Sequence, residues 1–296
     1  MSSEFGDWTS SIGCDGFFAE YWQRKVLALR LARSYFEQIA EEIGQLEVRR
    51  VAGLAQRGVQ AWIASTQVAH SVLNVDASSG MDALSAGATL YFIDLPFAGL
   101  KESLGRVVGT RPQNIIASLF LSPKNGGADW HLDANENFTL QLTGSKRWFV
   151  AETPAVEAAP DHYILGREVP YSMRDVLDLD KISVEPAQTI DMVQGSLLYV
   201  PRGFMHRTEA DEESWSLNLS YERTMWVDLL CFGLRRRLAL SEKWRGSVGG
   251  LGEACPQSSR RANILPDIVQ ELRTMLDDPQ ELEKICQDFL NRTEPD

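Results

Sequence analysis

Apolar and polar residues alternate along several short segments in the middle of the chain. Residues 138–142 alternate with a period of two, and residues 214–221 do the same. Such alternation is typical of strands with one buried face. Residues 115–121 and 197–200 are short apolar runs, and turns that contain Gly or Pro separate all these segments. Many short strands joined by such turns indicate an antiparallel barrel or sandwich.

The first 110 residues show a mixed pattern. An Asp-capped segment at 15–22 and the apolar spacing within 36–43 predict two helices. Residues 26–29 and 87–93 favour strands, because both are short and rich in apolar and β-branched side chains.

After residue 226 the pattern becomes helical. Residues 227–243 are apolar with a cluster of arginines, and residues 246–259 are rich in Gly and Ser, which predicts a loop. Residues 264–290 have apolar side chains at helical spacing. Pro279 predicts a break in that helical stretch.

The charge of the chain narrows the choice of partners. Lys and Arg number 29 and Asp and Glu number 41, so the formal net charge is −12. An acidic protein is a poor electrostatic match for a phosphate backbone, so we expect no direct binding of nucleic acid. A basic peptide or protein suits this charge better.

The chain has no sequence feature of secretion or of a membrane span. Its four cysteines form no C-x-x-C pair, which argues against a zinc site and favours buried thiols in a reducing cytosol. Residues 1–7 lack the basic and apolar regions of a signal peptide. No apolar stretch approaches the roughly 18 residues that a membrane span needs. We therefore expect a cytoplasmic protein with no membrane contact.

The four histidines are His70, His131, His162 and His206. His131 and Asp133 lie two residues apart, and in a strand such side chains share a face. His206 follows a Pro-Arg-Gly break, and a neighbouring strand would bring it opposite this pair. Two histidines and one carboxylate on one face of a metal are typical of non-haem iron(II) oxygenases, which keep open positions for a co-substrate and dioxygen. The alternative is a chance His-x-Asp pair without a metal.

Lys146 lies one strand and one turn after the His-x-Asp pair. A hairpin would return it toward the metal, where its ammonium would pair with a dicarboxylate, because an isolated buried charge is costly. A solvated lysine at a strand end is the alternative. His162 lies in an insert after this hairpin, where a loop histidine without a role is the simpler interpretation, and contact with substrate is the other.

Three segments carry a resemblance to a known family: DWHLD at 129–133, GSKRW at 144–148 and GSLLYVPRGFMH at 195–206. Together they resemble the Jumonji-C hydroxylases, and most of all the cupin-type ribosomal oxygenase branch. The asparaginyl hydroxylase of the oxygen-sensing pathway is a more distant relative. The resemblance extends over roughly residues 15–225.

The resemblance implies a complete metal and co-substrate site. It assigns three iron ligands: His131, Asp133 and His206. It assigns Lys146 to the distal carboxylate of 2-oxoglutarate, and it places Asn137 and Asn218 near the co-substrate. For both asparagines the alternative is an ordinary buried polar residue of a strand. Three further residues are candidates for lining the same pocket: Tyr91, Ser118 and Ser122.

The fold that these observations favour is mainly β with flanking helices, built on a double-stranded β-helix of the cupin or jelly-roll type. Residues 1–110 supply flanking helices and strands, residues 111–226 form the Jumonji-C core, and residues 227–296 form a C-terminal helical region. The apolar surface of that last region exceeds what helices on a barrel need. We therefore expect a symmetric homodimer through these helices. Packing of the helices on their own barrel is the alternative.

The function implied by the resemblance is an iron(II)- and 2-oxoglutarate-dependent oxygenase. It would use O2 to hydroxylate an amino-acid side chain in a peptide or protein, while metal and co-substrate carry the chemistry and the protein positions them. A hydroxylase of a free amino acid or a natural-product peptide is one alternative, and a non-catalytic metal-binding cupin is another. Because Asp133 is present as a ligand, a halogenase is disfavoured. Histone demethylation is less favoured, because the motifs are those of the hydroxylase branch.

Overall fold

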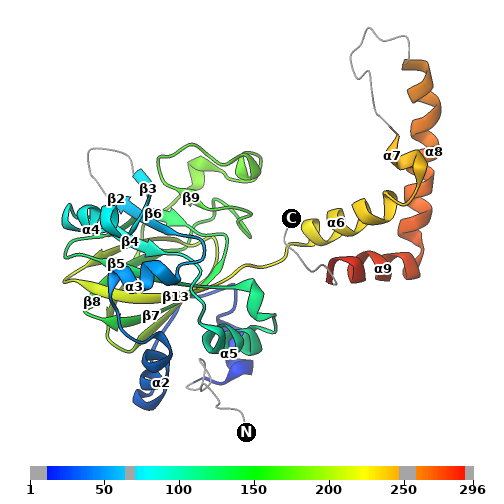
Figure 1. Cartoon of the computed structure of the whole chain (residues 1–296). Coiled ribbons are helices and arrows are strands. Elements are labelled where there is room, and N and C mark those ends of the chain that lie inside the picture. The colour runs from blue at the N-terminus through cyan, green and yellow to red at the C-terminus, as the bar shows by residue number, and fades with distance from the viewer. Residues whose placement is uncertain (1–11, 64–70, 247–257, 291–296) are drawn as a thin grey trace. The chain divides into compact units, whose positions relative to one another are not determined.

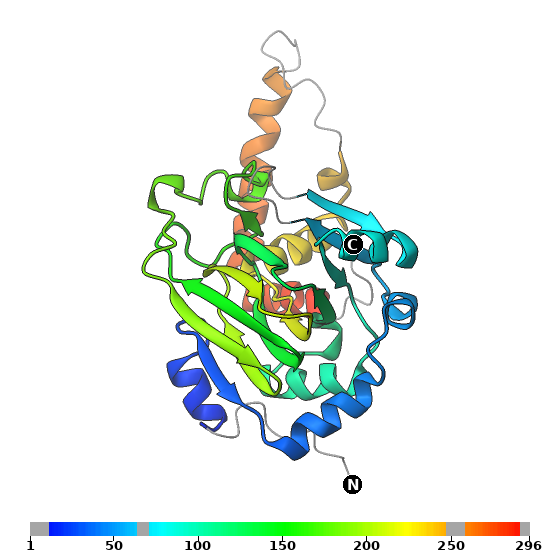
Figure 2. The same cartoon turned by 90° about the vertical axis from the view of Figure 1, so that its left-hand side faces the viewer.

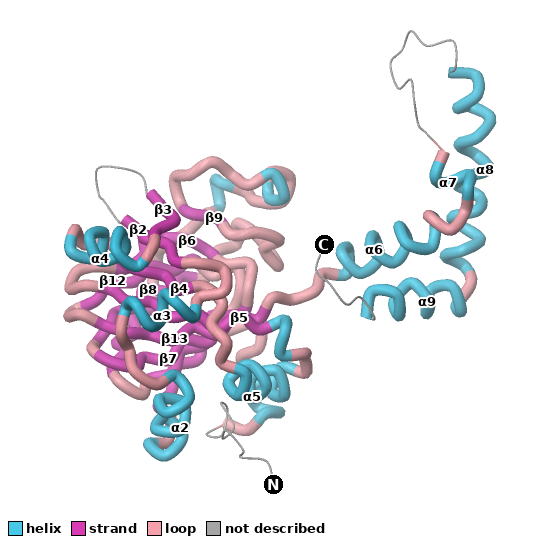
Figure 3. Tube along the Cα trace, in the orientation of Figure 1, coloured by secondary structure: helices cyan, strands magenta, loops and turns pink. Residues whose placement is uncertain are grey.

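The computed structural model of the chain describes residues 12–63, 71–246 and 258–290. The chain divides into two compact units, residues 1–223 and residues 224–296. The described strands all lie in the first unit, and the described elements of the second are helices (Figure 3). His70 and most of the loop predicted at 246–259 lie outside the described residues. The three-part division expected from the sequence stays a prediction.

Two antiparallel sheets form the centre of the first unit (Figure 1). The larger has eight strands in the order β1-β11-β7-β13-β5-β4-β2-β3, and the smaller has five in the order β10-β8-β12-β6-β9. The bounds are β1 (Leu27–Arg30), β2 (Val59–Ile63), β3 (Ser71–Val75), β4 (Thr89–Phe92), β5 (Ile115–Ser122), β6 (Gly127–Leu132), β7 (Glu136–Thr143), β8 (Ser145–Ala151), β9 (Tyr163–Ile164), β10 (Gln188–Val193), β11 (Ser196–Val200), β12 (Met205–Ala210) and β13 (Ser214–Tyr221).

From β5 onward the chain passes back and forth between the two sheets. Strands β5, β7, β11 and β13 belong to the larger sheet, and β6, β8, β10 and β12 to the smaller. This alternation is that of a double-stranded β-helix, so the predicted fold class is confirmed. The larger sheet also takes in β1 to β4 from the first 110 residues. That part of the chain therefore extends the sheet as well as flanking it.

Helices of the N-terminal part border the sheets (Figure 2). The helices of this unit are α1 (Cys14–Glu20), α2 (Arg33–Ile43), α3 (Val48–Leu54), α4 (Ala77–Ser85) and α5 (Ala98–Val108), with 3-10 turns at Pro112–Asn114, Tyr171–Met173 and Leu179–Lys181. The predicted helices at 15–22 and 36–43 are confirmed as α1 and α2, but the predicted Asp15 cap is wrong, because the N-cap of α1 is Gly13 and no side chain caps it. Both α3 and α4 begin at a side-chain cap that the sequence interpretation missed: Glu47 and Asp76 each accept two backbone N–H groups.

Strand β13 has two buried faces of different character. Leu217 and Leu219 point into the main hydrophobic core, which also contains Phe17 of α1 and Ile39 of α2. The polar side chains at alternate positions are also buried and line a cavity: Ser216, Asn218 and Ser220. The period-two pattern of this strand therefore separates a helix-packed face from a cavity-lining face.

The second unit contains the helices α6 (Trp226–Leu238), α7 (Glu242–Arg245), α8 (Ser258–Asp277) and α9 (Pro279–Leu290). The predicted break near Pro279 is confirmed. The helical pattern predicted over 227–243 is two helices, because α6 ends at Leu238 and a new helix begins after Ser241. None of the described helices is long and apolar enough to cross a membrane.

Helices α6 and α9 cross closely. Gly233 of α6 is buried, and a Cβ atom at this position would collide with the backbone oxygen of Ile285. The rings of Phe232 and Phe289 meet edge to face at 5.6 Å, and Arg237 pairs with Glu281 at 2.8 Å. The small residue lets the two helix backbones approach, and the ring contact and ion pair lie on either side of it.

Candidate active site

A cavity of about 400 Å³ is lined by strands of both sheets. Its walls come from alternate positions, since side chains two apart on a strand share a face. The larger sheet contributes Thr89 and Tyr91, Asn137 and Thr139, and Ser216, Asn218 and Ser220; the smaller contributes Lys146 and Trp148, and His206 and Thr208. Polar groups therefore project into the interior of the barrel from several strands at once.

His131 and His206 face each other across two paired strands. They are direct partners in the β6–β12 ladder, and their ring centroids lie 4.1 Å apart. Nδ1 of His131 lies 2.6 Å from the Asp129 carbonyl, and Nδ1 of His206 lies 3.0 Å from the Phe204 carbonyl. A carbonyl only accepts, so each Nδ1 carries the proton and each Nε2 keeps a lone pair. This arrangement orients metal-ligating imidazoles in proteins.

The position of His131 in the barrel opposes a positive charge on its ring. Burial and the neighbouring His206 ring lower the pKa of His131 to about 4. The indole of Trp148 stacks on His206 with ring centroids 5.5 Å apart. His131 is therefore neutral near pH 7, which is the form that binds a metal ion.

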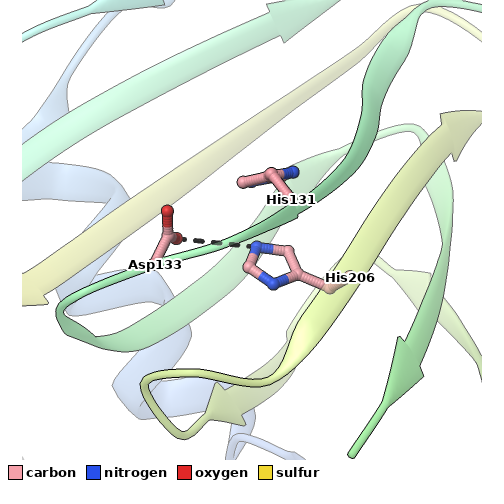
Figure 4. Close-up of side chains that lie close together, drawn as sticks. All are labelled: His131, Asp133 and His206. Atoms are coloured by element: carbon pink, nitrogen blue, oxygen red, sulfur yellow. Dashed lines mark ion pairs between the residues drawn. The ribbon is translucent and has the colours of Figure 1, made fainter. Parts of the chain in front are cut away.

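Asp133 lies in the turn just after β6, which ends at Leu132. The sequence interpretation placed His131 and Asp133 on one strand, and this is wrong for the carboxylate by one residue. Its Oδ2 still lies 3.5 Å from Nε2 of His206 (Figure 4). One potential ligand atom from each of His131, Asp133 and His206 lies within 4.8 Å of the others. The three predicted metal ligands are thus brought together.

Both oxygens of the Asp133 carboxylate have hydrogen-bond partners. Asn137 donates its Nδ2 to Oδ2 at 2.6 Å, and Nδ1 of His162 lies 2.8 Å from Oδ1. Burial alone would raise the pKa of Asp133, but the hydrogen bond with His162 opposes it and holds the pKa well below its usual range. Asp133 is therefore an anion over the whole physiological range.

A network of amides and hydroxyls orients Asn137. Its Oδ1 accepts from Asn218 Nδ2 at 3.2 Å and from Ser220 Oγ at 2.7 Å, which leaves Nδ2 for Asp133. The Thr139 hydroxyl donates to the side-chain Oδ1 of Asn218 at 3.1 Å. Both asparagines predicted near the co-substrate line the cavity. In this structure Asn137 holds Asp133, and Asn218 holds Asn137.

Lys146 is 3% exposed and extends into the same cavity. Its Nζ donates to Ser122 Oγ at 3.0 Å and lies 3.4 Å from Ser216 Oγ. Burial lowers its pKa to about 8. Among the described residues it has no carboxylate partner. Its other neighbour is the Phe120 ring, whose centroid lies 5.9 Å from Nζ. Hydroxyls and a ring face leave a buried positive charge that an anionic ligand would neutralise.

Other candidate residues divide into those at the cavity and those behind it. Tyr91 lines the cavity, and Ser122 contacts Lys146. Ser118 instead lies behind the cavity wall, where its hydroxyl donates to Tyr91 at 3.4 Å. Sequence reasoning missed Ser216, although its position two before Asn218 was a usable signal. It also gave His162 no role, because its approach to Asp133 depends on the path of a long insert.

The fold and the cavity define a class of protein: a double-stranded β-helix in which two histidines and one carboxylate converge beside a buried lysine. Residues 103–229 match the family model of the JmjC domain, so this part of the chain is similar to JmjC domains. The resemblance to the Jumonji-C oxygenases, expected from the sequence motifs, is confirmed.

Individual proteins of this kind are similar over part of the chain. The uncharacterized protein YxbC of Bacillus subtilis is 30% identical over 151 residues, which are 49% of this chain and 44% of YxbC. Human ribosomal oxygenase 1 is 34% identical over 137 residues, which are 45% of this chain and 19% of that protein. The chain thus spans less than half the length of these curated relatives.

A solved structure is similar over nearly the whole chain. The ribosomal oxygenase YcfD of Escherichia coli superimposes with a TM-score of 0.58 and 16% sequence identity. The match covers 97% of this chain and 72% of YcfD. At this identity the match supports the fold.

Proposed function

We propose that the chain is an iron(II)- and 2-oxoglutarate-dependent oxygenase. The observation that carries this proposal is one cavity that holds both a His-Asp-His cluster and a buried lysine without a carboxylate partner among the described residues. The JmjC match supports it. So does the similarity to YcfD, a structure of which contains cobalt and 2-oxoglutarate.

The donor set fits iron(II). Two neutral imidazoles and one carboxylate from one side leave open positions, which a closed four-ligand zinc site would not. The lone pairs on Nε2 of His131 and His206 and the anionic Asp133 are present without any rearrangement of protons. The buried ammonium of Lys146 fits the distal carboxylate of 2-oxoglutarate, and the hydroxyls of Ser122 and Ser216 beside it are further donors.

The chain's own residues prepare the site before any ligand binds. His131, Asp133 and His206 would hold the metal, and Lys146 would hold and orient the co-substrate. When bound, iron, 2-oxoglutarate and O2 together supply the oxidant that hydroxylates a C–H bond of the substrate. The stacked rings of Tyr91 and Phe120, 4.4 Å apart, form an apolar wall that keeps water from part of the cavity.

For the substrate, we propose an amino-acid side chain in a peptide or protein. The relatives named ribosomal oxygenases support this class. The net charge of −12 favours a basic partner over a nucleic acid. A free amino acid or a natural-product peptide stays the alternative, and the experiment below separates them.

The test is turnover of 2-oxoglutarate to succinate by the full chain. His131→Ala, Asp133→Ala and His206→Ala should each abolish it, because each removes one of three ligands. Glu168→Gln, an exposed change in the insert, should leave it unchanged and serves as the control. Near-native turnover by any triad variant would contradict the assignment at that position. A search for products 16 Da heavier, in lysate peptides and in amino-acid mixtures, then identifies the substrate class.

A further inference from the structure

We infer that His162 is a positioning residue: it holds one oxygen of the Asp133 carboxylate so that the other oxygen faces the metal. This inference rests on the proposed function, because it takes Asp133 as a metal ligand. His162 does not belong to the His-Asp-His cluster. It reaches the site from the insert between β8 and β10, and it lines the cavity.

The two oxygens of Asp133 have different surroundings. Oδ2 faces Nε2 of His206 at 3.5 Å, on the side where the ligand atoms converge. Oδ1 has its contact with Nδ1 of His162 at 2.8 Å. A carboxylate held at both oxygens cannot turn freely about its Cβ–Cγ bond. His162 thus favours a single ligating oxygen.

The proton on His162 lies on Nδ1. The backbone N–H of Ala134 also approaches Nδ1, at 3.4 Å, but one ring nitrogen cannot accept that bond and donate to Asp133 at once. A lone pair facing a carboxylate at 2.8 Å would be repulsive, whereas N–H to carboxylate is a short, charge-assisted hydrogen bond. The contact with Asp133 therefore determines the tautomer.

The insert places His162 independently of Asp133. Arg223 donates to the carbonyl oxygens of Ala134 and Ala159, so one guanidinium joins the turn after Asp133 to the segment before His162. The Asp161 carboxylate accepts the backbone N–H of His162 at 2.8 Å. It also accepts the hydroxyl of Ser172 at 2.6 Å. These bonds fix the backbone from which the imidazole extends, so the hydrogen-bond donor is in place before a metal arrives.

Loss of this contact should weaken metal binding. Partners of metal ligands contribute about 10- to 100-fold in metal affinity in other sites. The experiment is an anaerobic titration of the full chain with Co(II), followed by the visible absorption of the bound ion. His162→Ala should weaken Co(II) binding about 10- to 100-fold and change the absorption spectrum. His162→Asn, whose Nδ2 lies where Nδ1 was, should restore most of the affinity.

Two controls separate positioning from a structural role. Glu168→Gln lies in the same insert and is exposed, so its Co(II) affinity should equal that of the wild type. The metal-free His162→Ala protein should stay folded, with a melting temperature only slightly below that of the wild type, because the Asp133 anion loses one hydrogen bond. A much lower melting temperature with unchanged Co(II) affinity would show a structural role and overturn the inference.

The remaining outcomes of the Co(II) titration also test the inference. Unchanged affinity and spectrum in His162→Ala would overturn the inference, and so would an asparagine variant as weak as the alanine variant. Tighter Co(II) binding by His162→Ala would mean that the imidazole competes with the metal for Asp133. A wild-type protein that binds no Co(II), or binds it equally well after His131→Ala, would instead contradict the proposed function itself.

Discussion

Lys146 is the residue on which the proposed binding of 2-oxoglutarate depends most directly. Lys146→Ala should raise the 2-oxoglutarate requirement far more than the iron requirement, because it removes a charge-assisted contact in a buried site. Such a loss costs about 2–5 kcal/mol, or roughly 30-fold to several-thousand-fold in affinity. Lys146→Arg should be milder, since it keeps the cation and changes its geometry. Steady-state titrations measure both requirements, and an unchanged 2-oxoglutarate requirement in the alanine variant would place the anchor elsewhere.

The same lysine predicts a pH dependence. Burial lowers its pKa to about 8, so in the free protein the ammonium is present below that pH and is lost as the pH rises through it. The affinity for 2-oxoglutarate should therefore fall above about pH 8. Lys146→Arg should show no such fall, because a guanidinium stays protonated. Calorimetric titrations of the Co(II)-loaded protein between pH 6.5 and 9.5 compare the two; parallel curves would assign the pH dependence to another group.

The sequence predicted most readily those site residues that lie close to one another along the chain. His131, Asp133 and Lys146 lie within residues 131–146, a short stretch for which a hairpin was predicted, and His206 was expected opposite them on a neighbouring strand. The contact of His162 with Asp133 was not predicted, because His162 lies in an insert whose path no local sequence pattern specifies. Likewise, the hydroxyl that accepts from Lys146 belongs to Ser122 on β5, outside that stretch.

Among the elements, β7 and β8 do not pair with each other, so the hairpin expected from the sequence is wrong: β7 lies in the larger sheet and β8 in the smaller. The chain crosses from one sheet to the other and returns Lys146 to the cavity through a turn at Gly144. This residue has φ +65°, and a Cβ there would collide with the Glu213 backbone oxygen. Gly109, the C-cap of α5, has φ +69° but open space around it. Gly109→Ala should lower the free energy of unfolding by about 1 kcal/mol through conformation alone. Gly144→Ala should lower it by about 2–4 kcal/mol, because steric overlap adds to the same strain.

Chemical denaturation of the two glycine variants measures this difference. Equal losses would mean that the β13 side of the turn moves aside at little cost. The comparison isolates the steric contribution, because the two glycines have nearly the same positive φ and differ in their neighbours.

Strands were predicted from sequence where their apolar side chains face a core. Strands β7 and β13 showed alternation because one face of each packs on the hydrophobic core. Strand β12 lacks this apolar alternation, because its inward positions carry His206 and Thr208, and the strand expected at His206 was inferred from the pattern of metal ligands. The alternation in β13 also gave no sign that its polar face lies inside the barrel. An alternation with a period of two shows which residues share a face of a strand. Whether that face contacts the core, solvent or a cavity depends on the rest of the fold.

For the molecule as a whole, the predicted homodimer stays a proposal. Few side chains of the second unit are buried among its described residues, and three large apolar ones are strongly exposed: Trp226 at 78%, Val227 at 57% and Leu240 at 71%. Apolar surface of this kind favours a partner. Light scattering at micromolar concentration should give twice the monomer mass, and the monomer mass would contradict the dimer. A chain that ends before residue 264 should give monomers or aggregates if these helices form the interface.

The pairing of His131 with His206 across β6 and β12 makes a bound metal a cross-link between two neighbouring strands. Any local opening that separates these strands must then release the ion. At a metal concentration 100 times the dissociation constant, this adds about 2.7 kcal/mol to the cost of opening. Amide hydrogen exchange in β6 and β12 should slow about 100-fold on metal binding. The β5–β13 pair should change less, so metal binding would stabilise the smaller sheet selectively.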